Sequence, residues 1–534
     1  MAANGGRIGR VVSVSGAQII ALLDGPNSGN GSADLPATQI GRLVKMVTSA
    51  STVYGMVSGL SVPIPAQDED ADELKIAEFE AIGECLNGTN GSPVSFRRGV
   101  SIFPELGDDV FATTQEDLGH VYARPAVPTI GIGTVHQDRS LPAFLITDDL
   151  LGKHFAILGT TGSGKSCAVA LILHALLEQN PNAHVVVLDP HNEYANAFGD
   201  VAEVIDPDTL ELPYWLLTLE EMVEVALGSE GDERAGDAAI LSELIQKCKQ
   251  EFPGNAEIAE TLTVDTPVPY KLGDFTRLIN DAMGKLGGKP EALAPYQRLK
   301  ARFETLETDK RFAFMFEGLN VRDNMSKVLS RIFRVPVSGR PISIINLSGV
   351  PSEILNVVVS VLCRMTFDLA LWSDRAVPTL LVCEEAHRYA PQDTALGFEP
   401  TKRALSRIAK EGRKYGVSLC VVSQRPSELA TDILSQCNTI FALRLSNQKD
   451  QEFVQSAMSE SAVGLIDSLP SLLNTEAIVV GEGVSVPMRM CFNDLSKERR
   501  PLSGTAGFAA AWQEDQQSDT FLEEIVDRWR RQRR

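Results

Sequence analysis

The chain has 534 residues, which suggests three or four domains at about 150 residues each. Its net charge of −21 argues against nonspecific nucleic-acid binding by the outer surface, so such contact must come from a local basic element. Eight cysteines without a Cys-x-x-Cys pair argue against a metal or disulfide framework and predict small buried side chains in a reducing compartment.

Residues 1–135 are predicted to form a small β-barrel or sandwich that serves as an assembly or docking domain. Short β-like runs alternate with glycine, proline, asparagine and aspartate at intervals of about 8–15 residues. The expected strands are residues 10–14, 18–23, 41–47, 53–57, 73–83, 99–103 and 109–112, with a loop at 26–34. No catalytic constellation occurs among them. The polar first ten residues do not form a secretory signal, and residues 125–142 are interpreted as a bridge to the next domain.

The stretch that follows has the order required for phosphate binding. Apolar residues 155–158 predict a buried strand, and residues 167–177 predict a buried helix. The intervening spacing Gly-x-x-x-x-Gly-Lys-Ser is that of a P-loop, whose glycines let backbone N–H groups surround phosphates at a helix N-terminus. The predicted nucleotide contacts are Gly159, Thr160, Thr161, Gly162, Ser163, Gly164, Lys165, Ser166 and Cys167. Lys165 is expected to reach the β- and γ-phosphates of ATP, and Ser166 to hold Mg²⁺.

Residues 184–189 form a continuous apolar run, as in a strand buried on both faces of a parallel sheet. The run ends at Asp189, which either lines a ligand site at the carboxyl end of the strand or caps the following turn. Residues 205–335 then predict a helical insertion with solvated charged faces. Its expected helices are residues 219–227, 238–252, 272–286 and 292–307.

The sheet is predicted to resume after the insertion. Further strands are expected at residues 341–347, 378–385, 417–423, 439–445, 477–481 and 486–492, with helices at 353–373, 400–414, 427–435 and 448–458. This alternation predicts an α/β fold with a doubly wound, mainly parallel sheet built from residues 136–204 and 336–495. Residues 357–372 contain Ser360, Arg364 and Asp368 and are too polar for a membrane span of about 20 residues. Residues 496–534 are expected to be a polar tail that ends in a helix with a basic tip. Packing of this helix on a neighbour is favoured over phosphate binding and over a simply solvated helix.

Two acidic residues end the strand predicted at 378–385. Glu384 is expected to contact Mg²⁺, often through water, although aspartate is commoner at that place. Glu385 is expected to orient the attacking water; the alternative for both is a solvated turn. Gln424 follows the strand at 417–423 and is interpreted as a sensor of the γ-phosphate or the lytic water, with an ordinary turn closed by Pro426 as the alternative.

The helix at 400–414 concentrates positive charge. Its basic stripe, Arg403, Arg407, Lys410 and Lys414, recurs at i, i+4, i+7 and i+11 and therefore shares one face. Contact with a phosphate backbone and pairing with acidic residues of another subunit are equally favoured for this stripe. Arg413 lies at the end of the helix and is expected to reach transition-state charge on a nucleotide, in its own subunit or across an interface.

These motifs together resemble the HerA-type ATPases of the HerA–FtsK group of P-loop DNA translocases. The matching stretches are residues 159–166, 189–194, 384–387, 411–416 and 423–426. The resemblance implies a RecA-like core, an N-terminal barrel, and the roles given above for Lys165, Ser166, Glu385, Gln424 and Arg413. Family members often carry an arginine just before the P-loop strand that acts on the nucleotide of the neighbouring subunit. Lys153 occupies that position here and keeps the charge without the planar fork.

The resemblance also implies a homohexameric ring with double-stranded DNA in its pore and an effector partner, either a nuclease or a sirtuin-like NAD-degrading enzyme. The leading hypothesis is a cytoplasmic, ATP-hydrolysing DNA translocase or helicase, acting in antiviral defence or DNA end processing. A second hypothesis is a ring scaffold whose nucleotide state activates an effector without productive translocation. A third is a coupling ATPase of conjugation or secretion, which the absence of a predicted membrane segment disfavours.

Overall fold

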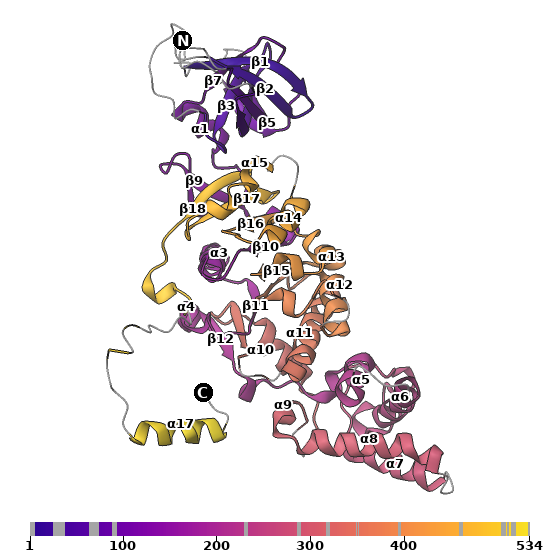
Figure 1. Ribbon diagram of the computed structural model, residues 1–534. Coiled ribbons are helices and arrows are strands. Elements are labelled where there is room, and N and C mark those ends of the chain that lie inside the picture. The colour runs from indigo at the N-terminus through magenta and orange to yellow at the C-terminus, as the bar shows by residue number, and fades with distance from the viewer. Residues whose placement is uncertain are drawn as a thin grey trace.

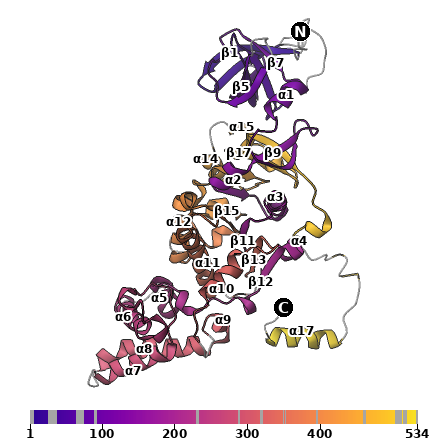
Figure 2. The same cartoon turned by 180° about the vertical axis from the view of Figure 1, so that it is seen from behind.

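The computed structural model places a barrel, a large sheet and a group of helices along one elongated molecule (Figure 1). It describes residues 6–24, 38–63, 74–87, 93–228, 233–285, 290–316, 321–348, 350, 352–393, 397–458, 463–502, 509, 512–513 and 519–531. The loop predicted at 26–34 lies outside these residues. The barrel and the helices occupy opposite ends, with the large sheet between them, in both views (Figures 1 and 2).

Within the described residues, seven strands form the N-terminal sheet in the order β2-β1-β7-β3-β4-β5-β6. They are β1 (Arg7–Ser15), β2 (Gln18–Leu23), β3 (Leu43–Val47), β4 (Ser51–Ser61), β5 (Ile76–Asn87), β6 (Pro93–Arg98) and β7 (Asp109–Ala112). Because β2 also pairs with β5, the first five strands and β7 close a barrel, which confirms the predicted architecture. The strand expected at 99–103 is wrong: these residues form bends and loop, and the strand, β6, precedes them.

Helix α1 (Gln115–Val121) is fixed against this barrel by one carboxylate. Thr114 and Asp117 form a capping box at its N-terminus. Asp117 also accepts a hydrogen bond from Lys45 of β3 at 2.7 Å, and both side chains are largely buried. Separating a buried ion pair would leave an unpaired charge in the protein interior, which is costly. The contact between Lys45 and Asp117 therefore holds α1 in one orientation on the barrel.

The large sheet has the order β12-β13-β11-β14-β15-β10-β16-β17-β18-β8-β9 among the described residues. Its strands are β8 (Thr129–Val135), β9 (Pro142–Ile146), β10 (Phe155–Leu158), β11 (His184–Asp189), β12 (Ala202–Ile205), β13 (Ile342–Asn346), β14 (Thr379–Cys383), β15 (Val417–Ser423), β16 (Thr439–Ala442), β17 (Glu476–Gly481) and β18 (Met488–Phe492). Pairing is parallel from β12 to β16 and antiparallel from β16 to β9. The mainly parallel α/β sheet predicted from the sequence is confirmed.

Strands β8 and β9 differ from the sequence interpretation. Residues 125–142 were expected to bridge two domains, with the boundary at 136, but β8 pairs with β18 and so belongs to the large sheet. The core positions of β8, Ile130 and Ile132, alternate with the glycines Gly131 and Gly133. A Cβ at Gly133 would lie 2.1 Å from the carbonyl oxygen of Cys491, so glycine is required where β18 passes.

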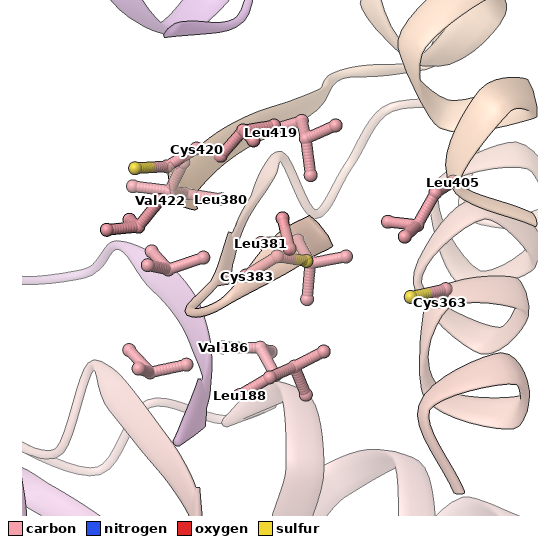
Figure 3. Close-up of a cluster of buried hydrophobic side chains, with 14 of the residues drawn as sticks. Val186, Leu188, Cys363, Leu380, Leu381, Cys383, Leu405, Leu419, Cys420 and Val422 are labelled. Atoms are coloured by element: carbon pink, nitrogen blue, oxygen red, sulfur yellow. The ribbon is translucent and has the colours of Figure 1, made fainter. Parts of the chain in front are cut away.

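Helices cover both faces of the sheet: α3 (Lys165–Gln179) packs on one face, and α11 (Ser352–Trp372) and α12 (Glu399–Tyr415) pack on the other (Figures 1 and 2). The shorter helices of this part are α2 (Thr147–Gly152), α4 (Ala195–Phe198), α13 (Thr431–Leu434), α14 (Gln448–Ala457) and α15 (Val463–Ile466). Figure 3 shows Cys363 and Cys383 among Leu381, Leu405 and other apolar side chains between β14, β15 and helices α11 and α12, while Cys420 of β15 points to the opposite face of the sheet. All eight cysteines are free, and six are buried, as expected of small apolar residues.

Helix α11 is a core element despite its composition. Its segment Ile354–Trp372 is, among the described residues, long and apolar enough for a membrane span by length and composition, but 72% of it is buried inside the protein. Arg364, one of its charged residues, pairs with the buried carboxylate of Glu221 at 3.1 Å. The charge is therefore satisfied where α5 packs on α11.

The helical insertion comprises α5 (Leu219–Leu227), α6 (Arg234–Glu251), α7 (Leu272–Lys285), α8 (Pro290–Thr308), α9 (Ala313–Phe316) and α10 (Met325–Phe333). Helices α5 to α8 project from the sheet at the end opposite the barrel, whereas α10 contacts β11 and β13 (Figure 1). The C-terminal helix α17 (Asp519–Arg531) leaves Leu522 and Trp529 60% and 79% exposed. The packing predicted for this helix therefore has no partner among the described residues.

Candidate active site

The P-loop lies at the carboxyl end of β10, a fully buried strand between β15 and β16. Gly162 and Gly164 adopt positive φ values of 75° and 102°, a conformation that favours glycine. A Cβ on Gly164 would also lie 2.6 Å from the carbonyl oxygen of Asn474. These glycines allow the tight turn of the loop, which ends at Gly164, so that α3 begins at the next residue, Lys165.

The donors of this loop suit a triphosphate. Lys165 is 8% exposed, and its Nζ donates to the carbonyl oxygen of Thr160 at 3.1 Å. Burial lowers the pKa of Lys165, while the charges of Glu385, Glu384 and Glu193 oppose that shift. The Ser163 hydroxyl is buried without a hydrogen-bond partner in the described part of the chain. A buried ammonium, an unpaired hydroxyl and a helix N-terminus together form an anion-binding cradle.

Glu384 and Glu385 follow β14, which is separated from β10 by the single strand β15. Glu384 is 5% exposed and accepts a hydrogen bond from the hydroxyl of Tyr194. Burial raises the pKa of Glu384 to about 8, and the Tyr194 bond opposes the shift. The Ser166 hydroxyl and the Glu384 carboxylate are hard oxygen ligands of the kind that Mg²⁺ prefers, so this pair fits the ion.

Glu385 has the features of a reactive carboxylate. Its backbone is left-handed, with φ at 51°, a strained conformation for a non-glycine residue. Its Oε2 is buried without a hydrogen-bond partner among the described residues and lies 3.3 Å from Nδ1 of His387. Burial raises the pKa of Glu385, and burial also lowers the pKa of His387 to about 4, so the imidazole is neutral at pH 7. The carboxylate is therefore free to accept a proton from a bound water.

Gln424 is brought directly to the P-loop, since its Oε1 accepts a hydrogen bond from the Thr161 hydroxyl. The preceding Ser423 hydroxyl lies 3.1 Å from Nδ1 of His387, which links the end of β15 to Glu385. A cleft of about 720 Å³ adjoins Gln424 and His387 and is also lined by Arg388 and Arg425. The sensor expected at Gln424 is thus placed between the P-loop, the carboxylate and an open cleft.

Asp189 has the capping position that was one of its two interpretations. Its carboxylate accepts N–H hydrogen bonds from His191 at 3.2 Å and Tyr194 at 3.0 Å, and it is 1% exposed. The turn it closes delivers the Tyr194 hydroxyl to Glu384. Neither Tyr194 nor His387 was identified from the sequence as a site residue, although both lie inside the motifs that marked the site.

Arg413 and Lys153 lie at the amino ends of the parallel strands, which we call the amino edge of the sheet; the P-loop lies at the opposite, carboxyl edge. Lys153 precedes β10, at the amino ends of the parallel strands, and pairs with Glu482 and, at 3.4 Å, with Asp149. The hydrogen bond from Lys153 lowers the pKa of Glu482, and the charge of Arg413 on α12 adds to this shift. These cations are therefore separated from the P-loop of their own chain by the length of β10, and the structure does not bring Arg413 to that loop.

The basic stripe also makes contacts within its own chain, and the two interpretations considered for it stay predictions. Arg403 pairs with Glu220 at 2.6 Å, and Lys410 pairs with Asp432 at 2.9 Å. Arg407 stacks over the ring of Phe367 at 4.0 Å and lies 3.9 Å from Asp368. These acids come from α5, α13 and α11, which are distant in sequence. Three of the four cations are thus already paired.

The protonation of Glu384 leads to a testable stability effect. Because its folded pKa of about 8 lies above the ordinary value of 4.5, its contribution to stability is complete below about pH 4.5 and is lost as pH rises through about 8. Glu384→Gln, which remains neutral, should therefore unfold at a higher temperature than the unchanged protein at pH 9, with the difference shrinking towards pH 5. Thermal unfolding without nucleotide tests this, and the exposed Glu411→Gln serves as control. An equal difference at both pH values would contradict the burial effect.

Comparison with known proteins agrees with this geometry. Residues 130–366 match a protein-family model described as "Helicase HerA, central domain". The chain carries a HerA-family helicase domain. The HerA-type domain starts within β8, consistent with the place of that strand in the large sheet. The resemblance inferred from the motifs is confirmed, and the chain is an enzyme of the P-loop ATPase and helicase class.

Relatives extend the likeness beyond the HerA-type domain. The DNA double-strand break repair helicase HerA of Pyrococcus furiosus is 27% identical over 465 residues, which are 80% of this chain and 78% of that protein. The protein of the same name from Saccharolobus solfataricus is 26% identical over 516 residues, 92% of this chain and 94% of that protein. The solved structure of VirB4 from Thermoanaerobacter pseudethanolicus has a TM-score of 0.51 at 16% identity, covering 71% of this chain and 99% of that one. The last similarity concerns the fold alone.

Proposed function

We propose that this HerA-type protein is a cytoplasmic, ATP-driven DNA translocase or helicase that works as a homohexameric ring around double-stranded DNA. One observation carries the proposal: the candidate catalytic groups are divided between the two edges of one sheet. Lys165, Glu384, Glu385 and Gln424 converge at the carboxyl edge, whereas Arg413 lies at the amino edge. A head-to-tail ring would place the amino edge of one subunit against the P-loop of the next and so complete each site.

Within one subunit the residues divide the work of ATP hydrolysis. Lys165 and the loop N–H groups bind the phosphates. Ser166 and Glu384 would hold Mg²⁺, which would supply charge stabilisation on the phosphate oxygens. Glu385 orients the attacking water and accepts its proton. Gln424, bonded to Thr161, reports on the γ-phosphate side of the loop.

The interface contribution is assigned to Arg413 rather than to Lys153. Lys153 is engaged by Glu482 and Asp149 and lacks the planar fork of arginine. Arg413 is exposed and forms no ion pair within the described ranges. A guanidinium so placed can bind the transferring phosphoryl group of a neighbouring subunit.

The N-terminal barrel is proposed to dock an effector, a nuclease or a sirtuin-like NAD-degrading enzyme, in antiviral defence or DNA end processing. Arg98 of β6 donates to the carbonyl oxygens of Gly481, Val484 and Ser485 at 2.6–2.7 Å. Gly481 adjoins Glu482, the partner of Lys153 at the amino edge. The barrel thus contacts the same loop as the proposed subunit interface, which supports communication between nucleotide state and effector.

DNA-stimulated hydrolysis tests the motor proposal. The steady-state ATPase rate should rise severalfold with long duplex DNA at low salt, and DNA affinity should fall by about 10³-fold or more between 50 and 200 mM salt if six or more phosphates are contacted. Mass photometry with ATP measures the ring size. Hydrolysis without DNA binding or stimulation at low salt would exclude the motor and leave the nucleotide-gated scaffold.

A further inference from the structure

Three potential metal ligands meet where strands β8, β17 and β18 lie side by side in the large sheet. His136 follows β8, Glu476 begins β17, and Cys491 lies in β18. Nδ1 of His136 is 3.0 Å from Oε1 of Glu476, and Sγ of Cys491 is 3.9 Å from that nitrogen and 3.8 Å from that oxygen. Among the residues that the structure describes, this is the one such group of three.

The separations fit a zinc ion. The circle through the three atoms has a radius of about 2.1 Å, and zinc binds nitrogen or oxygen at about 2.0–2.2 Å and sulfur at about 2.3 Å. An ion slightly out of their plane would therefore reach all three, with its fourth position directed to solvent, since the His136 side chain is 39% exposed. Nitrogen, sulfur and carboxylate oxygen are also the ligand types that zinc prefers.

The surrounding contacts orient Glu476 for this role. Its Oε2 accepts hydrogen bonds from Arg489 at 2.6 Å and from the N–H of Leu473 at 3.2 Å, while Oε1 faces the imidazole and the thiol. Such outer contacts fix a ligating carboxylate. Arg489 and Arg139 bring positive charge nearby, but a thiolate and a carboxylate together offset the charge of a divalent ion.

We propose that His136, Glu476 and Cys491 form a site for zinc or a similar thiophilic divalent cation at the junction of barrel and helicase domain. Gln137, next to His136, accepts a hydrogen bond from the N–H of Leu43 in barrel strand β3 at 3.1 Å. A metal ion there would tie the turn between β8 and β9, which contacts the barrel through Gln137, to strands β17 and β18. On binding, the Cys491 thiol releases its proton to solvent and the sulfur bonds to the ion.

Metal titration of the full-length chain tests the site. The protein, treated with a chelator and free of nucleotide, should take up one equivalent of Zn²⁺ in competition with a chromogenic chelator. Co²⁺ in its place should produce a sulfur-to-cobalt charge-transfer band. Cys491→Ser should abolish the band, and His136→Gln should abolish the one-equivalent uptake. His120→Gln, which alters a half-buried histidine outside the cluster, and Cys167→Ser, which alters the exposed thiol, should retain both.

The measurement on the unchanged protein tests the proposal even if a variant fails to fold. Uptake of no stoichiometric Zn²⁺, or a cobalt spectrum without a thiolate band, would overturn the proposal and leave a His136–Glu476–Arg489 ion-pair network. Uptake that persists in folded Cys491→Ser and is lost in Glu384→Gln would place the ion at the nucleotide site and overturn it as well. Circular dichroism establishes the folding of each variant.

Discussion

Replacing Glu385 by glutamine is expected to lower kcat for ATP hydrolysis by about 10²–10⁴-fold, the usual contribution of a positioned general base. The amide keeps the size of the side chain but cannot accept the proton of the attacking water. Because Glu385 makes no hydrogen bond through Oε2 among the described residues, its loss should leave the phosphate cradle at Lys165 intact. Single-turnover hydrolysis and the Kd for ATP, measured on the same preparation, separate the two effects.

Glu411→Gln provides the matched control, since Glu411 is an exposed glutamate on α12 outside the site. It should hydrolyse ATP at the unchanged rate. If Glu385→Gln retained more than a tenth of the activity, a different group would have to orient the water. A parallel loss of ATP binding would instead indicate that Glu385 has a structural role in the cradle.

The sequence predicted those parts of the site that are local in the chain. Lys165, Glu384, Glu385 and Gln424 each follow an apolar run that ends at the carboxyl edge of a parallel sheet, and the structure brings them together there. Which of these residues bears each role in the reaction remains a prediction. Strand periodicity and loop glycines are short-range signals, and they were sufficient for the placement of these four.

Contacts between residues far apart in the chain could not be predicted from local sequence patterns. Nothing in the neighbourhood of Tyr194 indicates that its hydroxyl bonds to Glu384, 190 positions further along the chain. The ion pairs of the basic stripe on α12 were missed for the same reason. The periodicity correctly placed its cations on one face, but the acids that pair with Arg403 and Lys410 come from α5 and α13. A helical wheel shows which side chains share a face and not what covers that face.

Because the candidate catalytic groups lie at opposite ends of the parallel strands, Arg413 is proposed to act on the nucleotide of a neighbouring subunit. Arg413→Ala should lower kcat by about 10³-fold or more, as expected when an arginine that stabilises transferring phosphate is removed. ATP binding to the P-loop of the same chain should change little, because Arg413 lies at the opposite edge of the sheet. Lys414→Ala, which removes the neighbouring exposed cation, is the control and should remain active. Steady-state hydrolysis and nucleotide titration measure both quantities.

Mixing two inactive variants distinguishes action across an interface from action within one subunit. Lys165→Ala lacks a competent P-loop but keeps Arg413, whereas Arg413→Ala keeps the P-loop. In randomly mixed rings at equal ratio, about a quarter of the interfaces would combine an intact P-loop with an intact arginine from the neighbour, so activity should reappear. Within a single subunit no such combination arises, and the mixture would stay inactive. Recovery of hydrolysis on mixing therefore requires that one subunit bind the nucleotide and the next subunit supply the arginine of that active site. In a ring, such shared sites would couple hydrolysis to ordered movement from subunit to subunit.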